Sequence, residues 1–455
     1  MDILSKLNIR KRRSGRSTIK NSPKKQCLMS HGPLGDFENL PLELKYKLFS
    51  YLTVTDLSKL ALASKALCKD VEDYRGTVYG RKKFLLNVDV HSMERTENWP
   101  SDAIHAYFRL GIYMKRTSFL KSTSKRLKHI GEYLSEHLIC KEQCGDGRRC
   151  VSFYCYGTFL HTMIAGWDDF ECLRVMEFVH QNSPVYRYLT RIFSSSPGTL
   201  PHLEVYVRCF YRRAFYDVLR KTEDKAYWLN TILKSHPIIN QAKLMQILFL
   251  PKNSLGVHFS AAVYDSWEVS CLAELGKALL YLSQQKLWTD DNIISVIDEI
   301  IALPSAWNHH NVATLLFNCG EEITLRVFIS KSINNRLSEI VCIAHHLLVV
   351  SVKASRSIET ASHCIWMLMS QIDTTKRVYI ATELVSNFKE AVIDMVDIGG
   401  GLVSELETLL EAASQFTQDI LQLALEALKD NKVPYRQLGK VSSHTFDQPS
   451  VQIEE

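Results

Sequence analysis

Four cysteines and two histidines between residues 137 and 161 carry the side chains that could bind a metal. Thiolate sulfur and imidazole nitrogen are the ligands that Zn²⁺ prefers in structural sites. The six residues are His137, Cys140, Cys144, Cys150, Cys155 and His161. Structural zinc sites usually pair close ligands two to four residues apart, and the intervals after Cys144 and Cys150 are wider. The spacing therefore favours reduced cysteines and predicts no metal or other cofactor, with zinc as the alternative.

Two pairs of adjacent histidines are the other candidates for chemistry, His309–His310 and His345–His346. Neighbouring residues on a helix point to different faces, so neither pair has the i, i+4 spacing of chelating histidines. Structural histidines are the expectation at both pairs. The chain also lacks a nucleophile elbow, a phosphate-binding Gly–Lys loop and a metalloprotease helix signature. We therefore predict a protein that is not an enzyme.

Helices must position any functional side chains, because the apolar pattern is helical nearly throughout. The chain has 455 residues, 46% of them hydrophobic and 23% charged, which is typical of a globular protein with a large core. Residues 262–284 and 291–303 show the pattern most clearly, with Leu272, Leu275, Leu279 and Leu282 in the first segment and Ile293, Ile297 and Ile300 in the second. Alternating strand patterns are scarce, and no leucine-rich repeat is present. The predicted fold is all-α, with an N-terminal helical hairpin or three-helix unit followed by an irregular, α-solenoid-like array of packed helices.

Two apolar stretches have alternative interpretations. A seam at spacings of four and three runs along residues 402–427, through Leu402, Leu406, Leu409, Ala413, Phe416, Ile420, Leu423 and Ala427. It is compatible with a coiled-coil partner, but packing on the preceding helices of the same chain is favoured. Residues 340–352 are too few to span a membrane and contain His345 and His346, so we expect a buried helix and no membrane partner.

The segment from Asp36 to about Val71 has distinct helix signals. Pro41 suits the first position of a helix, and Glu43 lies near the positive end of that helix. Thr55 is the predicted N-cap of a second helix. Apolar residues keep helical spacing in both, with Leu44, Leu48, Tyr51 and Leu52 in the first helix and Leu57, Leu60, Ala61, Ser64, Leu67, Cys68 and Val71 in the second. So small a unit needs a partner surface or the rest of the chain for stability.

The same segment resembles the F-box motif, where periodicity alone indicates an amphipathic helical hairpin. The resemblance rests on the order and spacing of Leu40-Pro41-x-Glu43-Leu44, Leu48, Tyr51-Leu52, Asp56-Leu57 and Leu60. Residues 63–67 depart from the family pattern, because they lack its valine–cysteine start and its frequent tryptophan. Four later segments resemble F-box proteins without recognised WD or leucine-rich substrate domains: Gly166–Cys172, Ala226–Lys234, Ile239–Ala242 and Trp288–Asp291.

The F-box resemblance implies a docking role and a function. In that family the segment binds the Skp adaptor, which joins it to a cullin scaffold and a ubiquitin-conjugating enzyme. The role carries over to ten residues: Leu40, Pro41, Glu43, Leu44, Leu48, Tyr51, Leu52, Asp56, Leu57 and Leu60. The implied function is a non-catalytic adaptor that recruits an unknown protein substrate for ubiquitylation. The alternative is a non-degradative structural or chromatin-associated protein that binds the Skp adaptor through the same segment.

The predicted domains are a disordered basic tail (1–35), the F-box (36–80), a helical body that binds substrate or partner (81–432) and a disordered tail (433–455). The net charge is +6. Residues 1–35 hold nine basic side chains and only Asp2 as an acid, so the rest of the chain is close to neutral. The charge of residues 36–455 therefore gives no reason to expect a nucleic-acid groove. The N-terminal residues show no apolar run ahead of a small-residue cleavage site, so we do not expect secretion. The twelve cysteines are expected to be reduced, without structural disulfides.

The basic tail contains the pattern of a bipartite nuclear-import signal. Its two clusters are Arg10-Lys11-Arg12-Arg13 and Lys24-Lys25. The predicted location is the nucleus, with the cytoplasm as a second compartment. The alternatives are a solvated tail with weak, salt-sensitive nucleic-acid contacts and a mitochondrial transit peptide.

Overall fold

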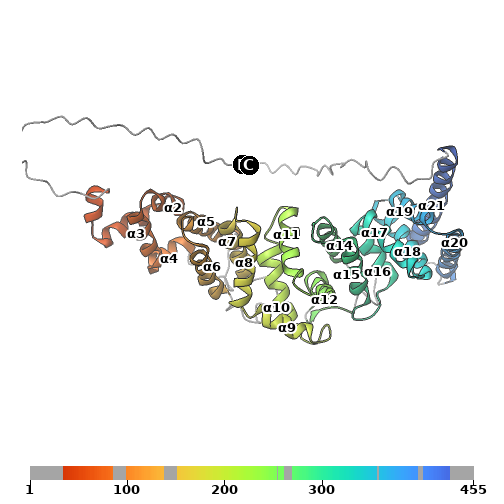
Figure 1. Cartoon of the computed structure of the whole chain (residues 1–455), viewed down its shortest axis with the longest axis horizontal. Coiled ribbons are helices and arrows are strands. Elements are labelled where there is room, and N and C mark those ends of the chain that lie inside the picture. Colours follow the sequence, from red (N-terminus) through yellow and green to blue (C-terminus); the bar gives the residue numbers. More distant parts are fainter. Residues whose placement is uncertain are drawn as a thin grey trace, which may run out of the picture.

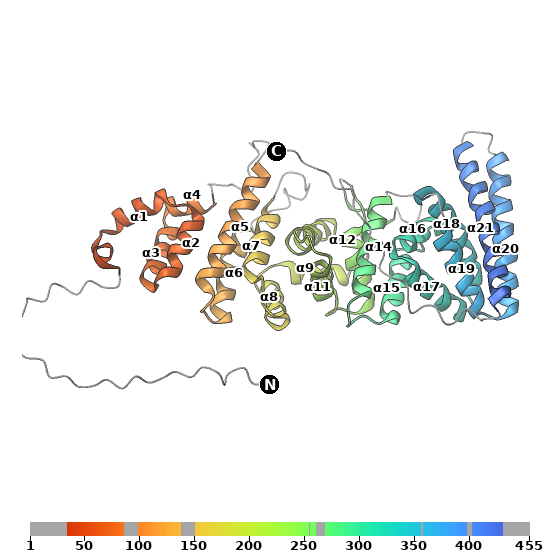
Figure 2. The same cartoon turned by 90° about the horizontal axis from the view of Figure 1, so that it is seen from above.

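The structure is a computed structural model that describes residues 34–85, 99–137, 151–253, 255–260, 269–355, 358–397 and 403–430. These residues form 20 α-helices and one short antiparallel strand pair, which confirms the all-α prediction. The helices follow one another along an elongated arc, with α1–α4 at one end and α20 and α21 at the other (Figures 1 and 2).

The N-terminal end is a unit of four short helices. Their bounds, with the preceding 3₁₀ turn η1, are η1 Gly35–Asn39, α1 Leu42–Tyr51, α2 Val54–Ala63, α3 Lys65–Gly76 and α4 Val78–Leu85. Because α4 crosses position 80, the predicted F-box boundary falls inside a helix. The unit packs on the body through α2 and α4, which both contact α5. One of these contacts is the edge-on ring pair Phe84–Tyr113, with centroids 4.9 Å apart.

The middle of the array contains eight α-helices, a π-helical turn (η3) and the strand pair. The bounds are α5 Trp99–Ser118, α6 Thr123–His137, α7 Ser152–Ile164, α8 Asp169–Gln181, α9 Val185–Phe193, α10 Pro201–Tyr211, η3 Arg212–Tyr216, α11 Thr222–Leu233, α12 Ile238–Phe249, β1 Lys252–Asn253 and β2 Gly256–Val257. Helix α7 packs closely on both α5 and η3. This approach depends on Gly157, since a Cβ atom there would lie 2.6 Å from the carbonyl oxygen of Ala214 in η3.

The C-terminal part is a regular stack of eight helices. They are α14 Val269–Ser283, α15 Asp290–Ala302, α16 His309–Cys319, α17 Glu321–Ile333, α18 Leu337–Ser355, α19 Glu359–Gln371, α20 Thr374–Asp397 and α21 Val403–Asp430. Each helix packs on the one two places further along, so α14, α16, α18 and α20 form one layer and α15, α17, α19 and α21 form another. Alternate-helix packing of this kind is the construction of a helical solenoid.

The predicted helical stripes lie in the core of this stack. The leucine stripe of residues 272–282 and the isoleucine stripe of residues 293–300 are buried in α14 and α15. One connected cluster of buried side chains extends from Phe49 in α1 to Phe416 in α21. Along the seam of α21, Leu409 and Phe416 are buried where that helix contacts α18, α19 and α20. The described part of the seam therefore packs on its own chain, as the sequence favoured.

Helix α18 corrects the expectation about membrane-spanning length. Its window Leu337–Ala354 is, by length and composition alone, long and apolar enough to cross a membrane. However, 56% of that window is buried inside the protein, where α18 packs on α16, α20 and α21. A core helix passes the same test, so this helix is weak evidence for a membrane span.

Candidate adaptor-docking site

One side of α1 is the inner face of the N-terminal unit. Phe49 is buried there against the edge of the Tyr74 ring of α3, with ring centroids 5.6 Å apart. Tyr46 contacts the same Tyr74 ring at 5.5 Å. These aromatic contacts fix how far α1 is rotated about its own axis.

A partly buried ion pair holds the same face of α1 on α3. Lys45 is only 7% exposed, and its Nζ lies 3.0 Å from Oδ2 of Asp70. The ammonium group also lies 5.4 Å from the centre of the Phe37 ring. Because an unpaired charge is costly to bury, Lys45 can occupy the inner face only in the orientation that keeps Asp70 in reach.

Another face of α1 exposes large apolar side chains. Leu44 is 49% exposed, Leu48 is 46% exposed and Tyr51 is 75% exposed, whereas Leu42, also 49% exposed, lies in the first turn on the same face as Lys45. Leu44, Leu48 and Tyr51 follow at spacings of four and three, so they share one face of the helix. Scattered surface leucines are ordinary, but a contiguous apolar stripe on a fixed helix is typical of a protein-binding surface.

The start of α2 corrects the predicted N-cap. Thr53, rather than Thr55, caps the helix, because its hydroxyl accepts a hydrogen bond from Asp56 N at 3.1 Å while Asp56 Oδ2 accepts from Thr53 N at 3.3 Å. The hydrogen bond from the Thr53 hydroxyl lowers the pKa of Asp56 below its usual value. Asp56 is thus a structural residue of the turn between α1 and α2. Similarly, Pro41 lies one position before the first helical residue of α1 rather than at it.

The predicted second helix is two helices. The backbone of Ser64 is extended, and its hydroxyl accepts a hydrogen bond from Leu67 N at 3.1 Å, so α2 ends at Ala63 and α3 begins at Lys65. Of the predicted docking residues in α2, Leu57 is fully buried and Leu60 is half-buried. Leu57 therefore supports the unit from inside and offers no surface to a partner.

The remaining predicted docking residues lie at the ends of α1. Pro41 and Glu43 are exposed at its start, and Leu40 and Leu52 are half-buried at its two ends. Sequence reasoning missed Leu42 of α1 and Leu62 of α2, which is 57% exposed. The exposure of Leu62 could have been predicted from the sequence, because it is a large apolar residue outside the inward stripe of Leu57 and Ala61.

The candidate zinc ligands are only partly described. Cys140, Cys144 and Cys150 lie outside the described residues. Cys155 is buried in α7, and the His161 ring packs on Trp228 at 5.2 Å with Nε2 3.0 Å from the carbonyl oxygen of Ala214. Burial lowers the pKa of His161 to about 4, so it is a neutral core histidine. Within the described ranges, no group of three or more His, Cys, Asp or Glu side chains could hold a metal.

The two histidine pairs meet in space, which the sequence did not indicate. His310 of α16 and His346 of α18 have ring centroids 5.6 Å apart, and the His345 ring lies 5.1 Å from that of His346. Burial lowers the pKa of His345 to about 4, and burial together with the neighbouring histidines lowers that of His346 to about 3. The His310 and His346 rings meet between α16 and α18, while the His345 ring also packs on Phe388 of α20 at 4.5 Å, and all three rings of this histidine cluster are structural. The basic import clusters of residues 10–25 lie outside the described residues.

A helical unit with an exposed leucine stripe joined to a helical solenoid is the architecture expected of an F-box protein with a solenoid body. More narrowly, the chain belongs to the family of F-box only protein 47. It is 34% identical to the human protein of that name over 326 residues. The aligned region covers 70% of this chain and 72% of the human protein. The identity and coverage are the same for the mouse protein of that name.

The solenoid also matches this family. The family model described as "FBXO47, ARM repeats" matches residues 181–396, from the end of α8 through most of α20. Two of the later segments noted in the sequence meet within this range, because Trp288 Nε1 donates to Asn230 Oδ1 at 2.8 Å. Both residues are buried, so the bond joins α11 to the turn before α15. No solved structure matches the chain.

Proposed function

We propose that this protein is a substrate-recognition adaptor of a Skp–cullin–F-box ubiquitin ligase. F-box proteins are typically non-catalytic adaptors of that complex. The single observation that carries the proposal is the exposed stripe of Leu44, Leu48 and Tyr51 on α1, held outward by the partly buried Lys45–Asp70 pair. The Skp adaptor would cover this stripe and link the chain to a cullin.

In this function the chain contributes geometry rather than chemistry. Ubiquitin transfer takes place on partner subunits, and a rigid adaptor raises the local concentration of a client lysine near them. The elongated array suits this role because the docking unit lies at one end and the solenoid extends away from it (Figure 2). The solenoid is the part of the chain that would select the client.

The test is co-purification with the Skp adaptor after two charges are placed on the stripe. Leu44→Glu with Leu48→Glu should abolish co-purification, because desolvating two carboxylates in an apolar interface is costly. Leu255→Glu with Ile333→Glu is the matched control, since these side chains are 82% and 76% exposed elsewhere in the array. Undiminished recovery of the adaptor with the stripe variant would refute the docking proposal.

Cullin recovery separates the proposal from the non-degradative alternative. A ligase subunit should co-purify the cullin together with the Skp adaptor and support ubiquitylation of a bound client in vitro. Recovery of the Skp adaptor without the cullin would favour the structural or chromatin-associated function.

We further propose that the clusters Arg10–Arg13 and Lys24–Lys25 direct nuclear import. A fluorescent reporter fused to residues 1–35 should accumulate in the nucleus, and substitution of the six basic residues by alanine should release it. A diffuse signal from the unsubstituted fusion would count against this proposal, and a mitochondrial signal would identify a transit peptide instead.

A further inference from the structure

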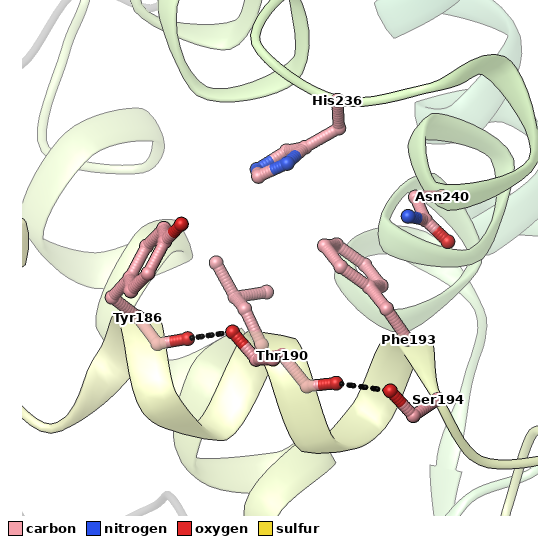
Figure 3. A pocket seen from close by; sticks show the side chains of 7 residues that line it. Tyr186, Thr190, Phe193, Ser194, His236 and Asn240 are labelled. Atoms are coloured by element: carbon pink, nitrogen blue, oxygen red, sulfur yellow. Dashed lines mark hydrogen bonds between the residues drawn. The ribbon is translucent and has the colours of Figure 1, made fainter.

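A hollow of about 280 Å³ opens between α9 and the turn that joins α11 to α12 (Figure 3). Tyr186, Thr190, Phe193 and Ser194 line it from α9 and the residue that follows. His236 and Asn240 face them from the other side. Sites for drug-sized ligands usually measure roughly 300–1,000 Å³. This smaller hollow therefore suits one large side chain of a peptide.

The walls of this hollow, which we call the groove, are held in place by the fold. The Phe193 and His236 rings pack edge-on with centroids 5.0 Å apart, and Gln241 Nε2 donates to the backbone oxygen of His236 at 2.7 Å. On α9, the Thr190 hydroxyl donates to Tyr186 O at 3.1 Å and the Ser194 hydroxyl to Thr190 O at 2.9 Å (Figure 3). A preformed groove costs little conformational entropy when a ligand binds.

Two polar groups of the groove have no hydrogen-bond partner within the described part of the chain. Nε2 of His236 is buried without a partner, and the Asn240 side-chain amide makes no hydrogen bond there. Burial lowers the pKa of His236, so the ring is neutral at pH 7 and can donate from one nitrogen and accept at the other. Buried polar atoms normally find partners, and the backbone of an extended peptide would supply them here.

The exposed charges that α9 carries beside the groove are positive, and the nearby acid Glu204 is buried. Residues 178–203 and 225–253, which include both walls, contain no Asp or Glu. Arg187 and Arg191 are exposed on α9, and neither forms an ion pair with the described residues. Lys243 also lies at the end of α9, where its Nζ donates to the backbone oxygens of Phe193 and Ser195 at 3.1 and 2.7 Å. Its charge interacts with the buried Glu204, so Arg187 and Arg191 are the cations left for a ligand. The complementary ligand is an acidic segment.

We propose that this groove binds an extended acidic segment of a client protein, with an apolar side chain in the hollow and carboxylates beside Arg187 and Arg191. The term client rests on the proposed ligase function, whereas binding of the peptide does not. The groove lies in the middle of the array, far along the chain from α1 (Figures 1 and 2). A peptide bound there would leave the exposed stripe of α1 free for the Skp adaptor.

The test uses the full-length chain and an array of synthetic ten-residue peptides. One series carries a Leu or Phe anchor beside two or three glutamates, a second replaces the glutamates by lysines, and a third replaces the anchor by alanine. The acidic, anchored series should bind at least about tenfold more tightly than either of the others. Its affinity should fall as salt is raised, because exposed charges are screened.

Two groove variants and one control complete the test. Arg187→Glu with Arg191→Glu, and separately His236→Ala, should each weaken the acidic series about tenfold or more, while binding to the Skp adaptor is unchanged. Arg220→Glu with Lys286→Glu makes the same charge change on exposed residues elsewhere and should retain peptide binding. Equal binding of the acidic and lysine series, or full binding by the arginine double variant, would overturn the proposal. Loss of Skp binding by the α1 stripe variant with peptide binding intact would keep the two proposals separate.

Discussion

Leu44 and Lys45 are neighbours in the sequence, yet they lie on different faces of α1. The leucine is half-exposed, whereas the lysine is buried with Asp70. From hydrophobicity alone, Leu44 would be expected to be buried and Lys45 to be exposed. The reversal is explained by the neighbouring aromatic residues, because Tyr46 and Phe49 bring the Lys45 side of the helix onto Tyr74 of α3.

The spacing predicted which residues of α1 share a face, but it did not predict whether that face points toward the protein or toward solvent. The spacing of Leu44, Leu48 and Tyr51 identified one helical face. Periodicity defines a face without stating whether protein or water covers it. The answer depends on a partner of Lys45 that lies 25 residues away, and such a long-range pair leaves no local signal.

The histidine cluster predicts a pH dependence of stability at the residue scale. His345 and His346 have folded-state pKa values of about 4 and 3, below the value of about 6.5 in an unfolded chain. The unfolded state therefore binds more protons between those values, and stability that is complete above about pH 6.5 is lost as the pH falls toward 4. His309 and Lys353, which also lower the pKa of His346, act in the same direction.

The measurement is the urea midpoint of unfolding at pH 7.5 and pH 5.0. His346→Gln should lose less stability over this interval than the unsubstituted chain. The control is His202→Gln, which changes an exposed residue and should retain the full pH dependence. A His346→Gln variant with an unchanged pH dependence would contradict the assignment.

At the scale of elements, helices were easier to predict than their ends. The stripes of α14 and α15 were predicted correctly because each keeps one face buried over about two to three turns. The start of α2 and the break at Ser64 were missed because several Ser and Thr residues compete for the cap positions. The choice depends on which hydroxyl reaches a backbone N–H, as Thr53 and Ser64 do.

Close helix packing predicts the effect of a substitution in α7. Gly157→Ala should lower the free energy of unfolding by about 1–3 kcal/mol, because the new Cβ would overlap the backbone of Ala214. This sign opposes the gain that alanine gives in an open helix. Thermal or denaturant unfolding measures the change.

Gly76→Ala is the matched control for that substitution. Gly76 ends α3, and no atom lies within 4 Å of the position that its Cβ would take. The free energy of unfolding of the Gly76→Ala variant should stay within about 0.5 kcal/mol of that of the unsubstituted chain. Equal effects of the two substitutions would show that the contact between α7 and η3 is not tight.

At the scale of the whole molecule, no boundary separates the N-terminal unit of α1–α4 from the body. Besides the Phe84–Tyr113 ring contact, Arg116 of α5 donates to the buried hydroxyl of Ser58 in α2 at 3.1 Å. The sequence predicted a boundary at residue 80, but the F-box motif carries no information about the face that α5 presents to α2 and α4. The described structure instead joins α1–α4 to the solenoid through one continuous core.

This continuity predicts the behaviour of two fragments. A fragment of residues 99–430 should melt on the order of 5 °C below a fragment of residues 34–430, because it exposes the face of α5 that α2 and α4 cover. The longer fragment should match the full chain. Equal melting temperatures of the two fragments would mean that the N-terminal unit is an independent module.

The affinity of the purified full-length chain for the Skp adaptor tests the central claim most directly. Calorimetry should show that Leu44→Glu with Leu48→Glu weakens binding at least about 30-fold, as expected for apolar anchors at an interface. The affinity of the control variant, Leu255→Glu with Ile333→Glu, should stay within about threefold of that of the unsubstituted chain. Equal affinities of the stripe variant and the unsubstituted chain, with both folded by circular dichroism, would contradict the account.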